Sequence, residues 1–285
     1  MSRTIYVNGE YLPEEEAKIS VFDRGFLFAD GVYEVTAILD GKLVDKQGHL
    51  SRLRRSLSEL DLPSPASDKE IEAIQRELIR RNKVTEGLVY LQVTRGSAER
   101  SFYFPDPETT PPSLVLFTQA LPVINNPQAE HGIKVITVED LRWTRRDIKT
   151  VQLLPSSMCK MAARAQGKDD AWMVQDGYVT EGTSNNAFLV KKNHIFTRRL
   201  SSDILPGITR ASVLAYAAEA GYEIQEVSFS VKEAQSAEEA FMTSATAFVL
   251  PVVEIDGQPV GDGRPGPVVR RLRELYIAES LRRAE

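Results

Sequence analysis

A lysine with apolar neighbours is the first residue whose setting suggests chemistry. Lys149 has Ile148 before it, Val151 two positions after it, and Leu153-Leu154 further on, so we expect it to be partly buried. Desolvation disfavours the charged ammonium and yields an amine that can perform Schiff-base chemistry. Most lysines are solvated surface groups, so Lys149 indicates a reaction only together with other residues.

Three further segments carry polar residues at the ends of expected strands or helices. Tyr178–Asn186 (YVTEGTSNN) places Glu181 among small hydroxyl and amide residues, which suits a buried polar pocket but also a solvated turn. Leu205–Arg210 (LPGITR) opens an expected helix, where free N–H groups and the positive end of the helix dipole favour a phosphate or an ordinary cap. Met242–Ala247 supplies small hydroxyl residues after an expected strand.

Other familiar motifs are incomplete. Gly261–Gly266 fits G-x-G-x-x-G but lies about 20 residues from the end, too close for a βαβ unit to follow. Gly177–Ser184 has Walker-like spacing, but Thr183 stands where the lysine is required. The histidines are scattered, so no metal site is expected; they are His49, His131 and His194.

Read together and in order, the segments resemble fold-type IV pyridoxal-phosphate enzymes, and most closely the D-amino acid aminotransferases. The resemblance runs from about Ile5 to Arg283, essentially the whole chain. It rests on DRGFLFADGVYEV (Asp23–Val35), GHLSRL (Gly48–Leu53), YLQVTRG (Tyr90–Gly96), RWTRRDIKT, YVTEGTSNNAF, LPGITR and the Thr243–Thr246 run. The agreement in order and spacing is specific, although each motif alone is not.

The resemblance implies pyridoxal 5'-phosphate as the cofactor. Lys149 would form the Schiff base and later carry the proton, and Glu181 would pair with the pyridine nitrogen, keeping the ring protonated. The phosphate would be bound by Arg52, Ile208, Thr209, Ser244 and Ala245, and Leu205 would lie against the ring face. Ala245 stands where relatives often have threonine, so only its backbone N–H could reach the phosphate.

The resemblance also implies that Tyr33 and Arg100 hold the substrate carboxylate, which an arginine binds bidentately. Relatives usually have histidine two residues after that arginine, but this chain has Phe102. The site thus has one polar group fewer, which favours less polar substrates, including (R)-configured primary amines.

The expected function is a pyridoxal-phosphate-dependent transaminase that moves an amino group from a D-amino acid to a 2-oxo acid, of the D-alanine/2-oxoglutarate type. Alternatives within the same fold are an (R)-amine transaminase, a branched-chain L-amino acid aminotransferase and, less favoured, an aminodeoxychorismate lyase. A non-catalytic phosphate-binding scaffold is the alternative of another class, and the pairing of Lys149 with Glu181 argues against it.

Composition sets the wider frame. The chain has 285 residues, 35 Lys and Arg against 40 Asp and Glu, and a net charge of −5, so no nucleic-acid partner is expected. The uncharged stretches are too short or too polar to span a membrane. The start has no apolar signal-peptide core, and one cysteine, Cys159, cannot form an intrachain disulfide, so a cytoplasmic location is expected.

Arg142, Arg145 and Arg146 could form a basic patch, although a solvated or interface cluster is the more ordinary interpretation.

The elements that must position these residues form an α+β fold. The length indicates roughly two domains, and Leu121–Gly132, rich in proline and asparagine, is the best linker. We expect a small N-terminal α/β domain over 1–120, a linker over 121–132, and a larger cofactor-binding domain over 133–285 with mixed sheets or a pseudo-barrel. By resemblance, the enzyme is a homodimer.

Local patterns predict individual elements. Asp-Gly pairs at 40–41, 176–177 and 256–257 lie between apolar runs and predict hairpins. Leucines on one side of His49–Leu60 predict a helix, and a second helix opens with a capping-box pattern at Ser67–Glu70. Helices are also expected at 157–166, 208–220 and 268–283.

Overall fold

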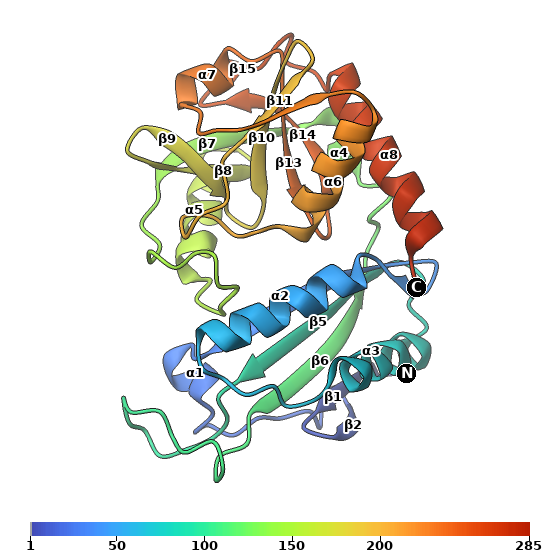
Figure 1. The fold of residues 1–285 in the computed structure, drawn as a ribbon, viewed down its shortest axis with the longest axis vertical. Helices are drawn as coiled ribbons and strands as arrows, with labels where there is room; N and C mark the ends of the chain where they lie inside the picture. Colours follow the sequence, from blue (N-terminus) through green and yellow to red (C-terminus); the bar gives the residue numbers. More distant parts are fainter. Residues whose placement is uncertain (1) are drawn as a thin grey trace. The chain divides into compact units, whose positions relative to one another are not determined.

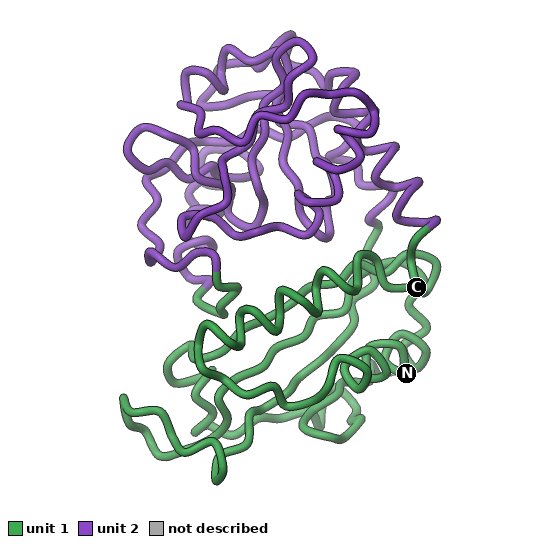
Figure 2. The backbone as a smooth tube through the Cα atoms, viewed as in Figure 1, with its two compact units in different colours: residues 1–122, 148–152, 283–285 green, residues 123–147, 153–282 purple. Residues whose placement is uncertain are grey.

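The computed structural model describes residues 2–285 and divides into two compact units, each with its own sheet. Within the described residues, unit 1 runs to Pro122 and includes residues 148–152 and 283–285. Unit 2 contains residues 123–147 and 153–282 (Figure 2). Both units combine helices with a sheet, as predicted. Among the described helices, none has the length and apolar character needed to cross a membrane.

The sheet of unit 1 has six antiparallel strands in the order β2-β1-β6-β5-β3-β4. Helices α2 (Lys46–Glu59) and α3 (Asp68–Asn82) cover one face of this sheet (Figure 1), and the short α1 (Arg24–Phe28) precedes β3. The strands are β1 (Thr4–Val7), β2 (Glu10–Pro13), β3 (Gly31–Leu39), β4 (Lys42–Leu43), β5 (Gly87–Thr94) and β6 (Ser113–Ala120).

Alternation along β3 gives the sheet of unit 1 two different faces, because successive strand residues point to opposite sides. Val32 packs in the core with Leu53 of α2, so Glu34 also points to the helix side. Tyr33 points to the other side, where its ring stacks on Tyr90 with 5.7 Å between centroids.

The local predictions for unit 1 are confirmed. Asp40 and Gly41 both have positive φ, 49° and 70°, as a two-residue hairpin turn between β3 and β4 requires. Ser67 and Glu70 form the predicted capping box of α3. Helix α2 begins at Lys46, earlier than the predicted His49, because its first turn is polar and carries no apolar stripe to mark it.

Unit 2 is built on a larger mixed sheet. Its strand order is β12-β11-β10-β13-β14-β7-β8-β9, with β15 added to β14. The pairs β11/β12, β14/β7 and β7/β8 are parallel and the others antiparallel. Strands β9 and β10 also contact each other, so the sheet curls, as the predicted mixed sheet or pseudo-barrel would. The strands are β7 (Ile133–Glu139), β8 (Asp170–Gln175), β9 (Tyr178–Gly182), β10 (Asn186–Lys191), β11 (His194–Thr197), β12 (Glu223–Glu226), β13 (Glu239–Ser244), β14 (Phe248–Ile255) and β15 (Gln258–Pro259).

The turns and the three longer helices of unit 2 follow their sequence signals, whereas the two five-residue helices, over 127–131 within the predicted linker and over 231–235, were not predicted. The Asp-Gly pairs at 176–177 and 256–257 have positive φ at both residues, which confirms the two hairpins. Helix α5 begins three residues before its predicted start, because Pro155 is accommodated in the first turn. The helices are α4 (Pro127–His131), α5 (Leu154–Ala165), α6 (Ile208–Glu219), α7 (Val231–Gln235) and α8 (Pro267–Arg283).

The segment predicted as a linker is ordered within the structure. Val123 is buried, and Arg273 of α8 donates to the carbonyls of Val123 and Ile124 at 2.8 and 2.9 Å. The unit division also differs from the predicted domain limits by grouping residues 148–152 with unit 1. The reason is a backbone pairing between this segment and β3, which brings Lys149 to the sheet of unit 1.

Candidate active site

Lys149 is attached to β3 through its backbone. Its carbonyl accepts a hydrogen bond from the Tyr33 N–H at 3.0 Å, and its own N–H donates to Ser56 Oγ at 3.3 Å. The next residue, Thr150, forms a bridge with Val32. These contacts place the Lys149 ammonium over the Tyr33 ring, 4.1 Å from its centroid. The structure therefore brings together two residues that the sequence analysis assigned to cofactor and substrate.

Arg52 lies on the opposite, helix-covered side of β3. Its Nε donates to Glu34 Oε1 and its Nη2 donates to Glu34 Oε2, both at 2.8 Å. His49 Nδ1 lies 2.7 Å from Oε2 of the same carboxylate. All three side chains are buried. Burial alone would raise the pKa of Glu34, but Arg52 and His49 outweigh it and lower that pKa to about 2. This network, which the sequence did not reveal, uses two of the five guanidinium N–H groups of Arg52.

Arg100 and Phe102 lie in the loop between β5 and β6. The guanidinium of Arg100 lies 5.4 Å from the Phe28 ring and 5.7 Å from the Phe102 ring, and Phe102 is 81% exposed. Arg24 holds this loop by donating to the Ser101 carbonyl at 2.7 Å. Among the described residues, the ring contacts of Arg100 are with these phenylalanines and not with Tyr33.

Glu181 lies near the end of β9 in unit 2, one residue before Gly182, and is almost completely buried. Its Oε1 accepts from Arg142 at 2.6 Å, and its Oε2 accepts from Asn186 Nδ2 and from the Leu205 N–H, both at 3.0 Å. A carboxylate offers about four acceptor positions, so one position on Oε1 is left among the described contacts. Burial raises the pKa of Glu181, and Arg142 and the Leu205 N–H oppose that rise.

Asn186 connects Glu181 to the start of α6. Besides Glu181, its amide donates to the Leu205 carbonyl at 3.0 Å. A Cβ at Gly207 would come within 2.1 Å of Asn186 Oδ1, so this close approach requires glycine. Gly207 caps α6 without a side-chain hydrogen bond, and the first N–H bonded inside the helix is that of Ala211. The preceding N–H groups, those of Ile208 and Thr209 included, have no partner within the helix.

Ser244 and Ala245 lie at the same end of the sheet. Asn186 of β10 pairs in register with Thr243 of β13, which directly precedes Ser244. The Ser244 hydroxyl accepts from the Ala247 N–H at 3.1 Å, which leaves its hydrogen able to donate elsewhere. Phe248 closes this hairpin with φ of 60°, a strained value for a bulky residue. A strained turn therefore presents Ser244 beside the residues that hold Glu181.

The arginine cluster differs from its sequence interpretation. Arg146 is buried, and Arg142 is held between Asp140 and Glu181 in ion pairs of 2.7 and 2.6 Å. Only Arg145 has the partly exposed setting expected of a surface group. A solvated or interface cluster was the wrong interpretation for Arg142 and Arg146, which lie against buried carboxylates of the same unit. Asp140, the acidic residue that directly follows β7, was the one signal that could have located their partner.

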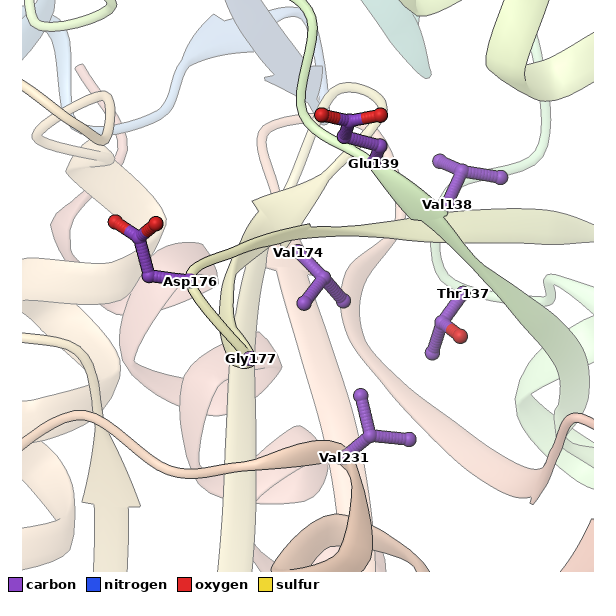
Figure 3. Close-up of a pocket in the computed structure, with 7 residues that line it drawn as sticks. All are labelled: Thr137, Val138, Glu139, Val174, Asp176, Gly177 and Val231. Carbon is purple, nitrogen blue, oxygen red and sulfur yellow. The ribbon is translucent and has the colours of Figure 1, made fainter.

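A separate hollow of about 340 Å³ lies in unit 2 (Figure 3). Its lining comes from β7, the β8–β9 hairpin and Val231, and includes none of the candidate residues. Among residues 2–285, no group of three or more His, Cys, Asp or Glu side chains could hold a metal ion.

The candidate residues thus form two sets. In unit 1 they are Tyr33, Arg52, Arg100, Phe102 and Lys149, and in unit 2 they are Glu181, Leu205, Ile208, Thr209, Ser244 and Ala245. The second set fits a phosphorylated pyridine. An uncapped helix start and a hydroxyl suit a phosphate, and the open acceptor position of Glu181 suits a protonated ring nitrogen.

Comparison with known proteins agrees with this chemistry. Residues 31–255 match the family described as amino-transferase class IV. The chain is 38% identical to a D-alanine aminotransferase of Staphylococcus aureus (strain MSSA476) over 274 residues, covering 95% of this chain and 96% of that relative. It is also 38% identical to a D-alanine aminotransferase of Bacillus licheniformis, covering 94% of each.

A solved structure extends the comparison to the fold. A branched-chain amino acid aminotransferase of T.th. with pyridoxamine 5'-phosphate matches with a TM-score of 0.90 and 30% identity, covering 99% of this chain and 96% of that one. The chain belongs to the amino-transferase class IV family and is a pyridoxal-phosphate-dependent aminotransferase.

Proposed function

We propose that the protein transfers an amino group from a D-amino acid, such as D-alanine, to a 2-oxo acid such as 2-oxoglutarate. The observation that carries the proposal is the placement of the Lys149 amine against Tyr33, on the face of β3 opposite the Arg52–Glu34 pair. Near full-length similarity to D-alanine aminotransferases supports the choice of a D-amino acid donor.

The residues of unit 2 would hold the cofactor. Pyridoxal phosphate, when bound, supplies a conjugated ring that accepts the electron pair released when the donor loses its Cα proton. Glu181 would accept a hydrogen bond from the protonated ring nitrogen, and the Leu205 side chain would lie against the ring. The phosphate would bind the N–H groups of Ile208 and Thr209, the Ser244 hydroxyl and the Ala245 N–H. The last of these replaces a side-chain donor that relatives often have.

The residues of unit 1 would complete the reaction. Lys149 would hold the cofactor covalently and then move the proton of the donor Cα, because the same amine is released beside that atom. By resemblance, Arg52 would also contribute to phosphate binding, although its Nε and Nη2 donate to Glu34 on the helix-covered side of β3. Tyr33 and Arg100 would hold the donor carboxylate. Phe102, in place of a polar residue, would weaken selection for acidic donors.

We further propose a homodimer in the cytoplasm. Monomers rarely expose large apolar patches, and unit 1 exposes a group on α1 and the β5–β6 loop, namely Phe26, Phe102, Tyr103 and Phe104. In unit 2, helix α5 exposes Leu154, Met158 and Met161. Sedimentation equilibrium should give twice the chain mass. Cys159 is a free thiol, which suits a reducing compartment.

Two experiments test the proposed function. The purified protein with pyridoxal phosphate should be yellow, and borohydride reduction followed by peptide mapping should place the cofactor on Lys149 and on no other lysine. A colourless protein would favour the scaffold alternative.

A panel of amino donors then separates the activities. D-amino acids should react faster than L-amino acids. Faster reaction of (R)-amines would favour the alternative that Phe102 suggests. Faster reaction of branched-chain L-amino acids would favour the activity for which the T.th. enzyme is named.

A further inference from the structure

Arg142 connects two buried carboxylates in unit 2. Its Nη1 donates to Glu181 Oε1 at 2.6 Å, while its Nε and Nη2 donate to the two oxygens of Asp140 at 2.9 and 2.7 Å. Planar, bidentate pairing of this kind fixes a guanidinium far better than a single contact does. Asp140 therefore sets the direction in which Arg142 approaches Glu181.

Asp140 is itself firmly held. Its side chain is fully buried, its N–H donates to the Val174 carbonyl at 2.8 Å, and its Oδ2 accepts from Thr180 Oγ1 at 2.6 Å. Arg146 lies 3.5 Å from Oδ1 on another side. Thr180 directly precedes Glu181 on β9, so the network is closed through the strand that carries Glu181.

The hydrogen bonds of Glu181 show what Arg142 contributes. Oε2 is filled by two neutral donors, Asn186 and the Leu205 N–H, and among residues 2–285 the donor to Oε1 is Arg142. Without Arg142, the described part of the chain leaves the carboxyl group no donor on Oε1 and no cation at hydrogen-bond distance. A buried carboxylate in that state is costly and is readily protonated.

We propose that Arg142, oriented by Asp140, is a positioning residue that holds Glu181 ionised with its open Oε1 position directed at the cofactor ring nitrogen. This inference rests on the proposed role of Glu181. It assigns Arg142 no contact with the cofactor or the substrate, so its effects pass through Glu181.

A pH dependence follows from the charges around Glu181. Arg142 contacts Glu181 directly, Asp140 pairs with Arg142, and Arg146 lies on the far side of Asp140. Asn186 and Leu205 contribute only neutral donors to Glu181. Burial raises the pKa of Glu181 and Arg142 opposes that rise. Replacing Arg142 should therefore move the protonation of Glu181 to higher pH, so that cofactor binding weakens first on the acidic side.

The test is a titration of the apo protein with pyridoxal phosphate across a range of pH. Arg142→Met should raise the Kd roughly tenfold at neutral pH, the lower range for loss of one charge-assisted hydrogen bond. It should also move the acidic limb of the Kd profile and of the cofactor absorption profile to higher pH. The matched control is Arg145→Met, three positions away and paired with Asp147 at 3.1 Å, which should leave both profiles within about twofold of wild type.

A double-mutant cycle separates positioning from a merely structural role. In the Glu181→Gln background, Arg142→Met should change the Kd by less than about twofold, because no carboxylate is left to orient. An additive loss in that background would overturn the inference, as would an unshifted acidic limb in the single variant.

Two further results keep the test decisive. If Arg142→Met does not fold, Arg142→Lys keeps the charge but cannot bind both carboxylates bidentately, and it should show a smaller rise in Kd with the same direction of pH shift. A wild-type profile for Arg142→Lys would overturn the inference.

If wild type itself fails to bind the cofactor through Lys149, the proposed function falls first. If Glu181→Gln behaves as proposed but Arg142→Met matches wild type, only the present inference fails.

Discussion

The Lys149 ammonium lies 4.1 Å from the centroid of the Tyr33 ring, and the same two residues share a backbone hydrogen bond of 3.0 Å. This double contact fixes both ends of Lys149 relative to β3, although the two residues lie far apart in the chain. Tyr33 is itself held in a stack with Tyr90, and burial, together with the nearby Tyr33, raises the pKa of Tyr90 to about 12. The lysine therefore has a rigid aromatic support.

Replacement of Lys149 tests its proposed role directly. Lys149→Ala should lower transaminase turnover by more than about a hundredfold, because the variant lacks the amine that would hold the cofactor and move the proton. Its thermal unfolding should stay close to that of wild type. Lys69→Ala, at an exposed position on α3, is the matched control and should keep full activity. Turnover above a hundredth of wild type in Lys149→Ala would contradict the assignment.

Glu181→Gln tests the pairing with the ring nitrogen. The amide keeps the shape of the side chain but cannot hold the pyridinium proton, so the variant should still bind pyridoxal phosphate while its half reactions slow by about two orders of magnitude or more. Stopped-flow measurement of each half reaction separates this loss from weaker binding. An unchanged rate would mean that Glu181 serves only to hold the turn at the end of β9.

Acid stability tests the network of Glu34. Its pKa is lowered to about 2 from an unfolded value near 4.5, so its stabilising contribution is present above about pH 4.5 and is lost as the pH falls toward 2. Glu34→Gln leaves Arg52 without its carboxylate and should lower the free energy of unfolding by roughly 3–5 kcal/mol at pH 7. Urea unfolding should show that the difference in free energy of unfolding between wild type and Glu34→Gln becomes smaller below about pH 4.5.

A surface carboxylate provides the control for that experiment. The Arg80 and Arg81 guanidinium groups lower the pKa of Glu77 to about 2 as well, but these two ion pairs lie on the solvent side of α3. Salt screens such pairs, so Glu77→Gln should leave the unfolding midpoint nearly unchanged. Equal losses of unfolding free energy in Glu34→Gln and Glu77→Gln would show that burial of Glu34 does not increase its contribution to stability.

The sequence predicted features that short segments specify on their own. An Asp-Gly turn needs only two residues with positive φ, and the capping box of Ser67 and Glu70 needs only their spacing; both are as predicted. The α+β class with a mixed second sheet followed from the same local patterns and from the resemblance to fold-type IV enzymes.

What the sequence could not reveal depends on pairings between distant residues. Glu34 meets Arg52 only because β3 and α2 pack together, and Arg142 meets Glu181 across 39 positions. A charged residue has no pattern that distinguishes a buried pair from a solvated one, so the arginine cluster was interpreted as a solvated or interface cluster. The attachment of Lys149 to β3 likewise arises from tertiary backbone pairing.

The loop that carries Arg100 and Phe102 decides the substrate range. Arg100 is an exposed residue beside the Phe28 and Phe102 rings. If it binds the donor carboxylate, Arg100→Ala should raise the KM for D-alanine by about ten- to a hundredfold, since a charge-assisted pair in a partly dry site is worth roughly 1.5–3 kcal/mol. The kcat should change much less.

A donor without a carboxylate provides the internal control for that substitution. An (R)-configured primary amine makes no ion pair with Arg100, so Arg100→Ala should leave its kcat/KM within about threefold of wild type. Phe102→His should act in the opposite direction on D-glutamate, because the imidazole adds a donor where the aromatic ring has none. Steady-state kinetics with D-alanine, D-glutamate and the amine separate the outcomes. Equal losses for the amino acids and the amine in Arg100→Ala would instead identify Arg100 as a residue that only supports the fold of the loop.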